Sequence, residues 1–169
     1  MLFRSPNSYD IINWNVAKYN NTRKKLNNRL MIFNTGIARK ASSVLSEQVD
    51  KLKTGINVDL TKQMVSLTEQ AVNFYSKDQL DDFGQLLDEA WKIKKNLSSN
   101  ITNPHIDEMY ETALKAGALG GKILGAGGGG YLLLYVSDDA RVSVLNAMRN
   151  YDYLPFKFTE EGSTVEMQS

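Results

Sequence analysis

Apolar residues recur at helical spacing in three consecutive segments of the chain. Within residues 37–53 they lie three or four positions apart, and Gly55 follows where a C-terminal cap is expected. The same spacing continues over 59–75, which Asp59 is placed to cap, and over 77–97. Each segment therefore predicts an amphipathic helix with one face in the core.

Two shorter helices and four strands complete the pattern. One helix is expected after Asn103, an N-cap residue followed by proline, with Gly117 at its end, and another after 137–139. Short apolar runs predict strands over 29–34, 119–124, 131–136 and 154–158. The mixed order of helices and strands indicates an α+β fold rather than a doubly wound parallel sheet.

The first 28 residues differ from the rest. They are polar and rich in asparagine, with Trp14 and the Ile11-Ile12 pair as the strong apolar positions. We expect residues 1–28 to be a lead-in or the remnant of a domain junction, and residues 29–169 to form one domain.

Composition and charge exclude several kinds of chemistry. The net charge of +1, from 20 basic and 19 acidic residues, offers no electrostatic footprint for nucleic acid or an anionic membrane. The absence of cysteine rules out disulfides and thiol nucleophiles, and the single histidine, His105, rules out multi-histidine metal sites. Without a signal-like start or a run of 18 apolar residues, the sequence predicts a cytoplasmic protein.

Residues 125–130, here called the glycine loop, carry the main candidate chemistry. Only Ala126 has a side chain, and such a backbone adopts positive φ and presents amides as an anion-binding nest. The loop formally matches G-x-G-x-x-G, but a strand follows instead of the helix that the dinucleotide motif requires. Tyr131 and Leu132 stand where a Walker A loop needs Lys-Ser/Thr. A glycine-rich hairpin that only lets two strands pack closely remains the structural alternative.

The segment from Lys122 to Tyr131 resembles the third conserved motif of the GHMP kinases. Residues 33–39 are similar to the F-x-T-G-I-x-R stretch of that family. Residues 103–107 and 116–122 resemble its sugar-kinase branch, which includes D-glycero-D-manno-heptose 7-phosphate kinase. The resemblance implies a ferredoxin-like C-terminal domain, with an antiparallel sheet of about four strands backed by about five helices.

That family transfers the γ-phosphoryl group of ATP, with Mg²⁺, to a sugar or sugar phosphate, and the branch points to heptose 7-phosphate. The resemblance implies that ATP and substrate contact Lys122, Gly125, Ala126, Gly127, Gly128, Gly129, Gly130, Thr35, Gly36 and Arg39. It identifies no catalytic residue or metal ligand in this chain. A bulky side chain at Gly127 or Gly128 is expected to push the ligand away. Lys122 as a solvent-exposed strand end and Arg39 as a surface salt bridge remain open alternatives.

One family pattern is missing from these 169 residues. A complete member has an N-terminal domain with the P-x-x-x-G-L-G-S-S phosphate loop and, usually, a catalytic aspartate, and the sequence contains no such loop. We therefore expect a C-terminal half that is inactive without its N-terminal partner. The alternative is a non-catalytic module that pairs with a separate N-terminal half or forms a homodimer through an apolar face. A weaker third reading is a regulator that binds nucleotide through the glycine loop alone.

Overall fold

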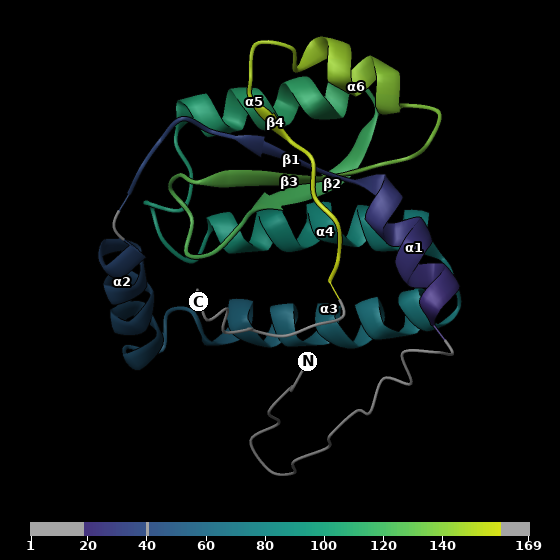
Figure 1. Cartoon of the computed structure of the whole chain (residues 1–169). Coiled ribbons are helices and arrows are strands. Elements are labelled where there is room, and N and C mark those ends of the chain that lie inside the picture. The colour runs from purple at the N-terminus through teal and green to yellow at the C-terminus, as the bar shows by residue number, and fades with distance from the viewer. Residues whose placement is uncertain (1–18, 40, 160–169) are drawn as a thin grey trace, which may run out of the picture.

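The structure, a computed structural model, describes residues 19–39 and 41–159. In this part of the chain a four-stranded antiparallel sheet lies between helical layers (Figure 1). α4 and, outside it, α3 cover one face, and α5 and α6 cover the other. The elements are α1 (Asn20–Arg29), β1 (Leu30–Asn34), α2 (Ala41–Lys53), α3 (Val58–Ser76), α4 (Leu80–Lys95), α5 (Pro104–Lys115), β2 (Ala118–Ile123), β3 (Tyr131–Val136), α6 (Arg141–Ala147) and β4 (Tyr153–Leu154).

The sheet has the order β2-β3-β1-β4, so β1 and β3 are its central strands. Leu132 on β3 pairs with Phe33 on β1 and with Ile123 on β2. The strand predicted over 154–158 is wrong in extent, because β4 is only two residues long. Pro155 has no amide to continue the ladder, and the Phe158 amide donates to Asn27 Oδ1 at 2.7 Å instead.

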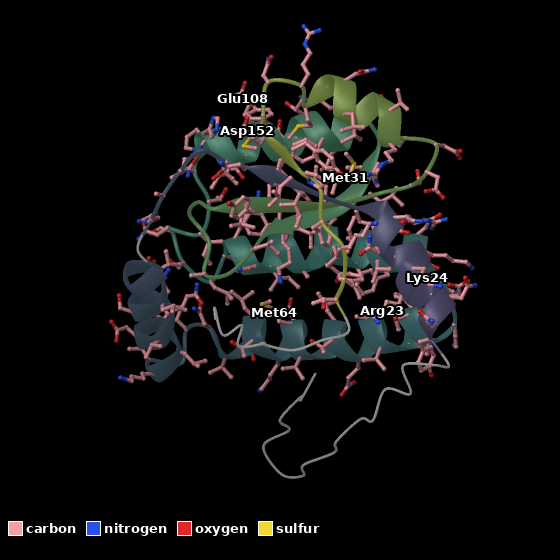
Figure 2. All side chains as sticks on the ribbon, viewed as in Figure 1. Arg23, Lys24, Met31, Met64, Glu108 and Asp152 are labelled. Atoms are coloured by element: carbon pink, nitrogen blue, oxygen red, sulfur yellow. The ribbon has the colours of Figure 1, made fainter. Side chains whose placement is uncertain are left out.

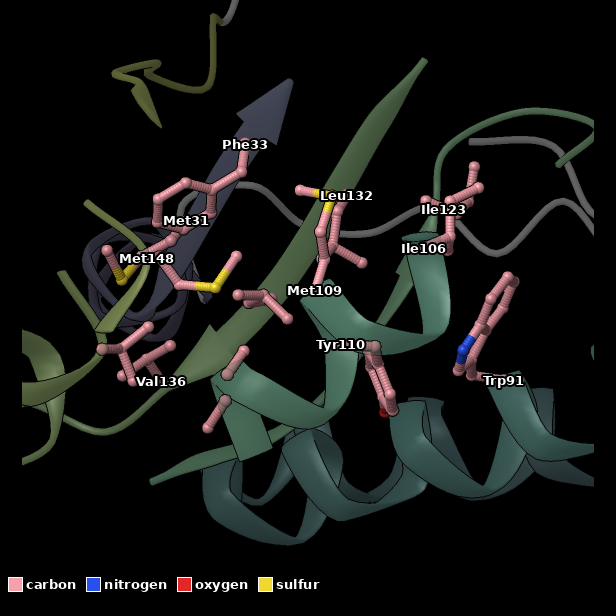
Figure 3. Close-up of a cluster of buried hydrophobic side chains, with 14 of the residues drawn as sticks. Met31, Phe33, Trp91, Ile106, Met109, Tyr110, Ile123, Leu132, Val136 and Met148 are labelled. Carbon is pink, nitrogen blue, oxygen red and sulfur yellow. The ribbon is translucent and has the colours of Figure 1, made fainter. Parts of the chain in front are cut away.

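Two clusters of buried side chains hold the layers together. The larger one lies between the sheet and α5, where Met31, Phe33 and Leu132 meet Ile106 and Met109 (Figure 3). The smaller one contains Leu26, Leu30, Leu80 and Tyr135 and lies on the α4 side of the sheet. Charged side chains such as Lys24 and Glu108 stay on the outside of the helical layers (Figure 2).

The α+β prediction and the antiparallel sheet of four strands are confirmed, whereas the described residues contain six helices rather than five. The additional helix, α1, occupies the end of the segment expected to be a lead-in. Its only strongly apolar residue is Leu26, which is buried. A helix with a single strongly apolar residue has no hydrophobic periodicity, so the pattern of apolar positions does not predict α1. Residues 1–18 lie outside the described part.

Two predicted helix starts are shifted. α2 begins at Ala41 rather than at Ile37, because the Ile37 carbonyl accepts a hydrogen bond from the Gly130 amide at 2.8 Å. α3 has Asn57 as its N-cap, and Asp59 lies in the first turn. Asn57 is buried and its Nδ2 donates to the Leu97 carbonyl at 2.8 Å, a tertiary contact that outweighs the local preference for Asp59.

Candidate functional site

The glycine loop joins β2 to β3 and contacts two other segments of the chain. Its base is closed by the Leu124 amide, which donates to the Tyr131 carbonyl at 2.9 Å. Further along, the Gly128 amide donates to the Ile101 carbonyl at 2.7 Å, and the Gly130 amide donates to Ile37. The loop is therefore the point where the β2–β3 connection meets residues 35–39 and 98–101.

The conformation and the packing of the loop both require glycine. Gly125, Gly127, Gly128 and Gly130 all have positive φ, between 78° and 109°. A Cβ on Gly127 would lie 2.9 Å from the Ile101 carbonyl oxygen. On Gly128 and Gly129 it would lie 2.7 Å and 2.4 Å from the carbonyl oxygens of Asn100 and Ile37.

These distances give a different reason why the loop requires glycine at these positions. We expected the close approach at Gly127 and Gly128 to be made by a ligand, but in the described structure the protein's own backbone makes it. Gly125 and Gly130 have open space around the Cβ position. Among the described residues, the Gly129 amide has no hydrogen-bond acceptor but is buried, whereas the amides of Gly125, Ala126 and Gly127 have no acceptor and lie at the less buried start of the loop. This first part of the loop is consequently the part that can still bind an anion.

Thr35 and Gly36 hold the other end of the loop. Thr35 is 2% exposed, and its hydroxyl and its amide both donate to the Gly130 carbonyl, at 2.8 Å and 2.9 Å. Gly36 turns the chain with a φ of 69°, and its amide donates to Asn34 Oδ1. Thr35 therefore acts through the loop, and its hydroxyl is not free to contact a ligand directly.

Arg39 lies beside Gly128 in the middle of the loop. Its Nη2 donates to Asn100 Oδ1 at 2.9 Å and its Nη1 to the Asn100 carbonyl at 3.2 Å. Among the described residues no carboxylate pairs with Arg39, so the predicted surface salt bridge is not what positions it. The guanidinium is exposed beside Gly128 and keeps a net positive charge there.

Asn100 is itself held by a residue that the sequence did not mark. Glu47 on α2 accepts from Asn100 Nδ2 at 3.0 Å and from Ser98 Oγ at 2.5 Å. Hydrogen bonds from Lys51, from Ser98 and from the Ser99 amide lower the pKa of Glu47 to about 2. The ionised carboxylate therefore fixes the 98–100 segment against the glycine loop.

Two lysines lie at the β2 end of the loop. Lys122, on β2, is partly exposed, and Lys94 comes from the last turn of α4. Lys94 Nζ donates to the Gly125 carbonyl at 2.6 Å. Burial, together with the nearby charge of Lys122, lowers the pKa of Lys94 to about 8. The sequence offered no signal for Lys94, because it is one of three lysines among residues 92–95.

The site is cationic and offers no ready-made metal site. The described residues contain no group of three or more His, Asp or Glu side chains that could hold a metal ion. Within the described ranges, no helix is both long and apolar enough to span a bilayer. The arrangement of backbone amides, Arg39, Lys94 and Lys122 is suited to holding phosphate oxygens.

Several known sequences are similar to this chain. The family described as GHMP kinases C terminal matches residues 71–154. The chain is 30% identical over 143 residues to D-glycero-alpha-D-manno-heptose 7-phosphate kinase of Campylobacter jejuni, covering 82% of this chain and 41% of that protein. It is 32% identical over 110 residues to L-fucokinase/L-fucose-1-P guanylyltransferase of Bacteroides fragilis, covering 64% of this chain and 12% of that protein. The chain thus spans less than half the length of these relatives.

Solved structures show the same fold. A putative sugar kinase from Campylobacter jejuni is 26% identical with a TM-score of 0.55, and the match covers 85% of this chain and 40% of that one. Mevalonate kinase of L. major, in complex with R-mevalonate, is 23% identical with a TM-score of 0.62 and matches over 72% and 37% of the two chains. The chain therefore carries the C-terminal domain of the GHMP kinase family.

Proposed function

We propose that this chain is the C-terminal part of an ATP-dependent sugar kinase. The kinase would transfer the γ-phosphoryl group of ATP to a sugar or sugar phosphate, with heptose 7-phosphate as the first candidate acceptor. The observation that carries the proposal is the glycine loop, which is held on both sides while the three amides at its start have no acceptor among the described residues. The similarity to the heptose 7-phosphate kinase supports the choice of acceptor.

Each site residue has a role in this proposal. The amides at Gly125, Ala126 and Gly127 bind phosphate oxygens of ATP or substrate, and Gly128 to Gly130 anchor the loop. Thr35 and Gly36 support it, Arg39 supplies positive charge beside Gly128, and Lys122 supplies positive charge separately, at the β2 end of the loop. Such a site suits phosphoryl transfer, in which catalysis consists mainly of positioning and charge stabilisation. Mg²⁺ would arrive bound to ATP.

The other half of the active site would come from an N-terminal GHMP kinase domain. The phosphate loop and the catalytic aspartate belong to that domain in the family, and the 169 residues contain no P-x-x-x-G-L-G-S-S pattern. We propose residues 29–169 as the C-terminal domain. We expect the chain alone to show no steady turnover.

A chimaera tests the proposal directly. Residues 29–169 would replace the matching region of the Campylobacter jejuni heptose 7-phosphate kinase, and ATP-dependent phosphorylation of heptose 7-phosphate would be measured. We expect activity from the chimaera and none from the isolated chain. A folded chimaera without activity, or steady turnover by the chain alone, would contradict the proposal.

A second candidate function is that of an interaction module. Leu45, Val49, Leu52 and Ile56 recur at a spacing of four, three and four, and they are 48%, 46%, 46% and 68% exposed. They form a continuous apolar stripe along α2 and the turn that follows it. No described residue buries this stripe, and exposed apolar patches favour association. It could bind a separate N-terminal half or a second copy of the chain.

A further inference from the structure

Lys94 and Lys122 are set apart from the neighbouring lysines by their lack of a carboxylate partner. Lys92 pairs with Asp88 at 2.6 Å and Lys95 with Asp107 at 3.2 Å. Neither Lys94 nor Lys122 forms an ion pair with any described residue. Carboxylates therefore neutralise Lys92 and Lys95, the lysines nearest to Lys94 in sequence, whereas no described carboxylate neutralises Lys94.

The fold brings the two lysines together on one side of the sheet. A Cβ on Gly120 would lie 2.6 Å from the Asp88 amide of α4. Because side chains alternate along a strand, Lys122 faces the same α4 layer as Gly120. Lys122 lines an open, mainly apolar cavity of about 1010 Å³ together with Leu87 and Leu133.

This arrangement is unfavourable unless an anion is present. Two like charges repel each other, and burial removes water that would screen them. Within the part of the chain that the structure describes, the Gly125 carbonyl is the one acceptor of a hydrogen bond from Lys94, so the ammonium group retains two further N–H donors there. A doubly charged phosphoryl group would satisfy these donors and neutralise both lysines.

The lysine pair and the loop amides lie on opposite sides of one peptide unit. The Gly125 carbonyl points towards Lys94. In a trans peptide the following N–H, that of Ala126, points the opposite way. An anion held by the lysines is therefore distinct from one held by the Ala126 amide.

We propose that Lys94 and Lys122 form a second phosphate site, which binds a phosphoryl group on the side of the glycine loop opposite to the Ala126 amide. This inference rests on the proposed kinase function: an enzyme that phosphorylates a sugar phosphate must hold the phosphoryl group of the acceptor in addition to those of ATP. The bound group belongs either to the phosphorylated acceptor or to the nucleotide, and the chemistry of recognition is the same.

The test uses the full chain with lysine side chains labelled for NMR and inorganic phosphate as the probe. We expect saturable shifts of the Lys94 and Lys122 side-chain signals. Lys94→Gln and Lys122→Gln should each weaken phosphate binding about tenfold, the effect of losing one charge-assisted hydrogen bond. Lys92→Gln is the matched control, since it removes the same charge from the same helix, and it should change binding less than about twofold.

Three results would overturn the second phosphate site. The first is no saturable shift in the wild-type chain, which needs no variant to interpret. The second is wild-type affinity in both Lys94→Gln and Lys122→Gln. The third is an equal loss in Lys92→Gln, which would reveal a general charge effect. Thermal unfolding of each variant checks that the fold is retained.

Two further titrations identify the source of the phosphoryl group. Weaker binding of heptose 7-phosphate but unchanged binding of ATP in Lys94→Gln would assign the site to the acceptor. Weaker binding of ATP but unchanged binding of heptose 7-phosphate would assign the site to the nucleotide. These experiments measure binding without turnover, so their failure leaves the proposed kinase role standing. An inactive chimaera together with intact phosphate binding would count against the kinase role alone.

Discussion

Arg39 and Asn100 are joined by two hydrogen bonds although 61 residues separate them in the sequence. Asn100 is held in turn by Glu47, so α2 is connected through the 98–100 segment to the glycine loop. The Arg39 guanidinium is thereby positioned by the neutral Asn100, and the Glu47 carboxylate behind Asn100 is paired with Lys51. Removing Glu47 should loosen this arrangement.

We expect Glu47→Gln to destabilise the chain at pH 7. The pKa of Glu47 is lowered to about 2, compared with 4.5 for the free side chain, so its carboxylate stabilises the folded state above pH 4.5. That contribution is lost as the pH falls through about 2. Urea unfolding of wild type and variant should show a difference at pH 7 that shrinks below pH 4.5. Glu111→Gln, which removes an exposed carboxylate, is the control.

Gly129→Ala should be more damaging than Gly125→Ala. A Cβ on Gly129 would lie 2.4 Å from the Ile37 carbonyl oxygen, whereas Gly125 has open space. The overpacked variant should lose about 3 kcal/mol in the free energy of unfolding. Gly125→Ala should lose about 1 kcal/mol in the free energy of unfolding, because alanine at a φ of 78° is strained. Chemical unfolding of both variants measures the difference, and equal losses would argue against backbone packing as the reason for Gly129.

Lys94 should titrate near pH 8 and respond to Lys122. Burial and the charge of Lys122 lower its pKa from 10.5 to about 8. Folding therefore disfavours the charged form, and the contribution of Lys94 to stability rises as the pH increases from about 8 to 10.5. NMR of the Lys94 side chain should show the lowered pKa, and Lys122→Gln should raise it. An unchanged pKa in that variant would mean that the two charges do not interact.

Substitution of the α2 stripe should separate association from folding. Val49 and Leu52 are both 46% exposed, so Val49→Lys and Leu52→Lys should leave the thermal unfolding temperature nearly unchanged. If the stripe is an interface, light scattering should show association in the wild-type chain that these lysines abolish. Val142→Lys is the control, because Val142 is 69% exposed on α6. A monomeric wild type at all concentrations would exclude self-association and leave pairing with an N-terminal half to test.

Elements set by short-range chemistry were predictable. Asn103 caps α5, with its Oδ1 accepting from the Ile106 amide at 3.1 Å, and Pro104 follows at the first helical position. The strand over 131–136 has the bounds that its apolar run predicts. In both cases the deciding interactions involve neighbours in sequence or a simple alternation of burial, so no knowledge of distant partners is needed.

By itself, the sequence determined the α+β class, the glycine loop between two strands and the candidate site residues around it. Only the tertiary structure decided which backbone atoms those glycines contact. It also decided that the Thr35 hydroxyl hydrogen-bonds to the loop, and that Lys94 lies at the same end of the loop as Lys122. In addition, it decided that α1 packs through Thr22 and Leu26. The physical reason is distance along the chain. Caps and periodicity act within a few residues, whereas the tertiary hydrogen bonds of this site join residues from 27 positions apart (Ile101 and Gly128) to 95 positions apart (Thr35 and Gly130).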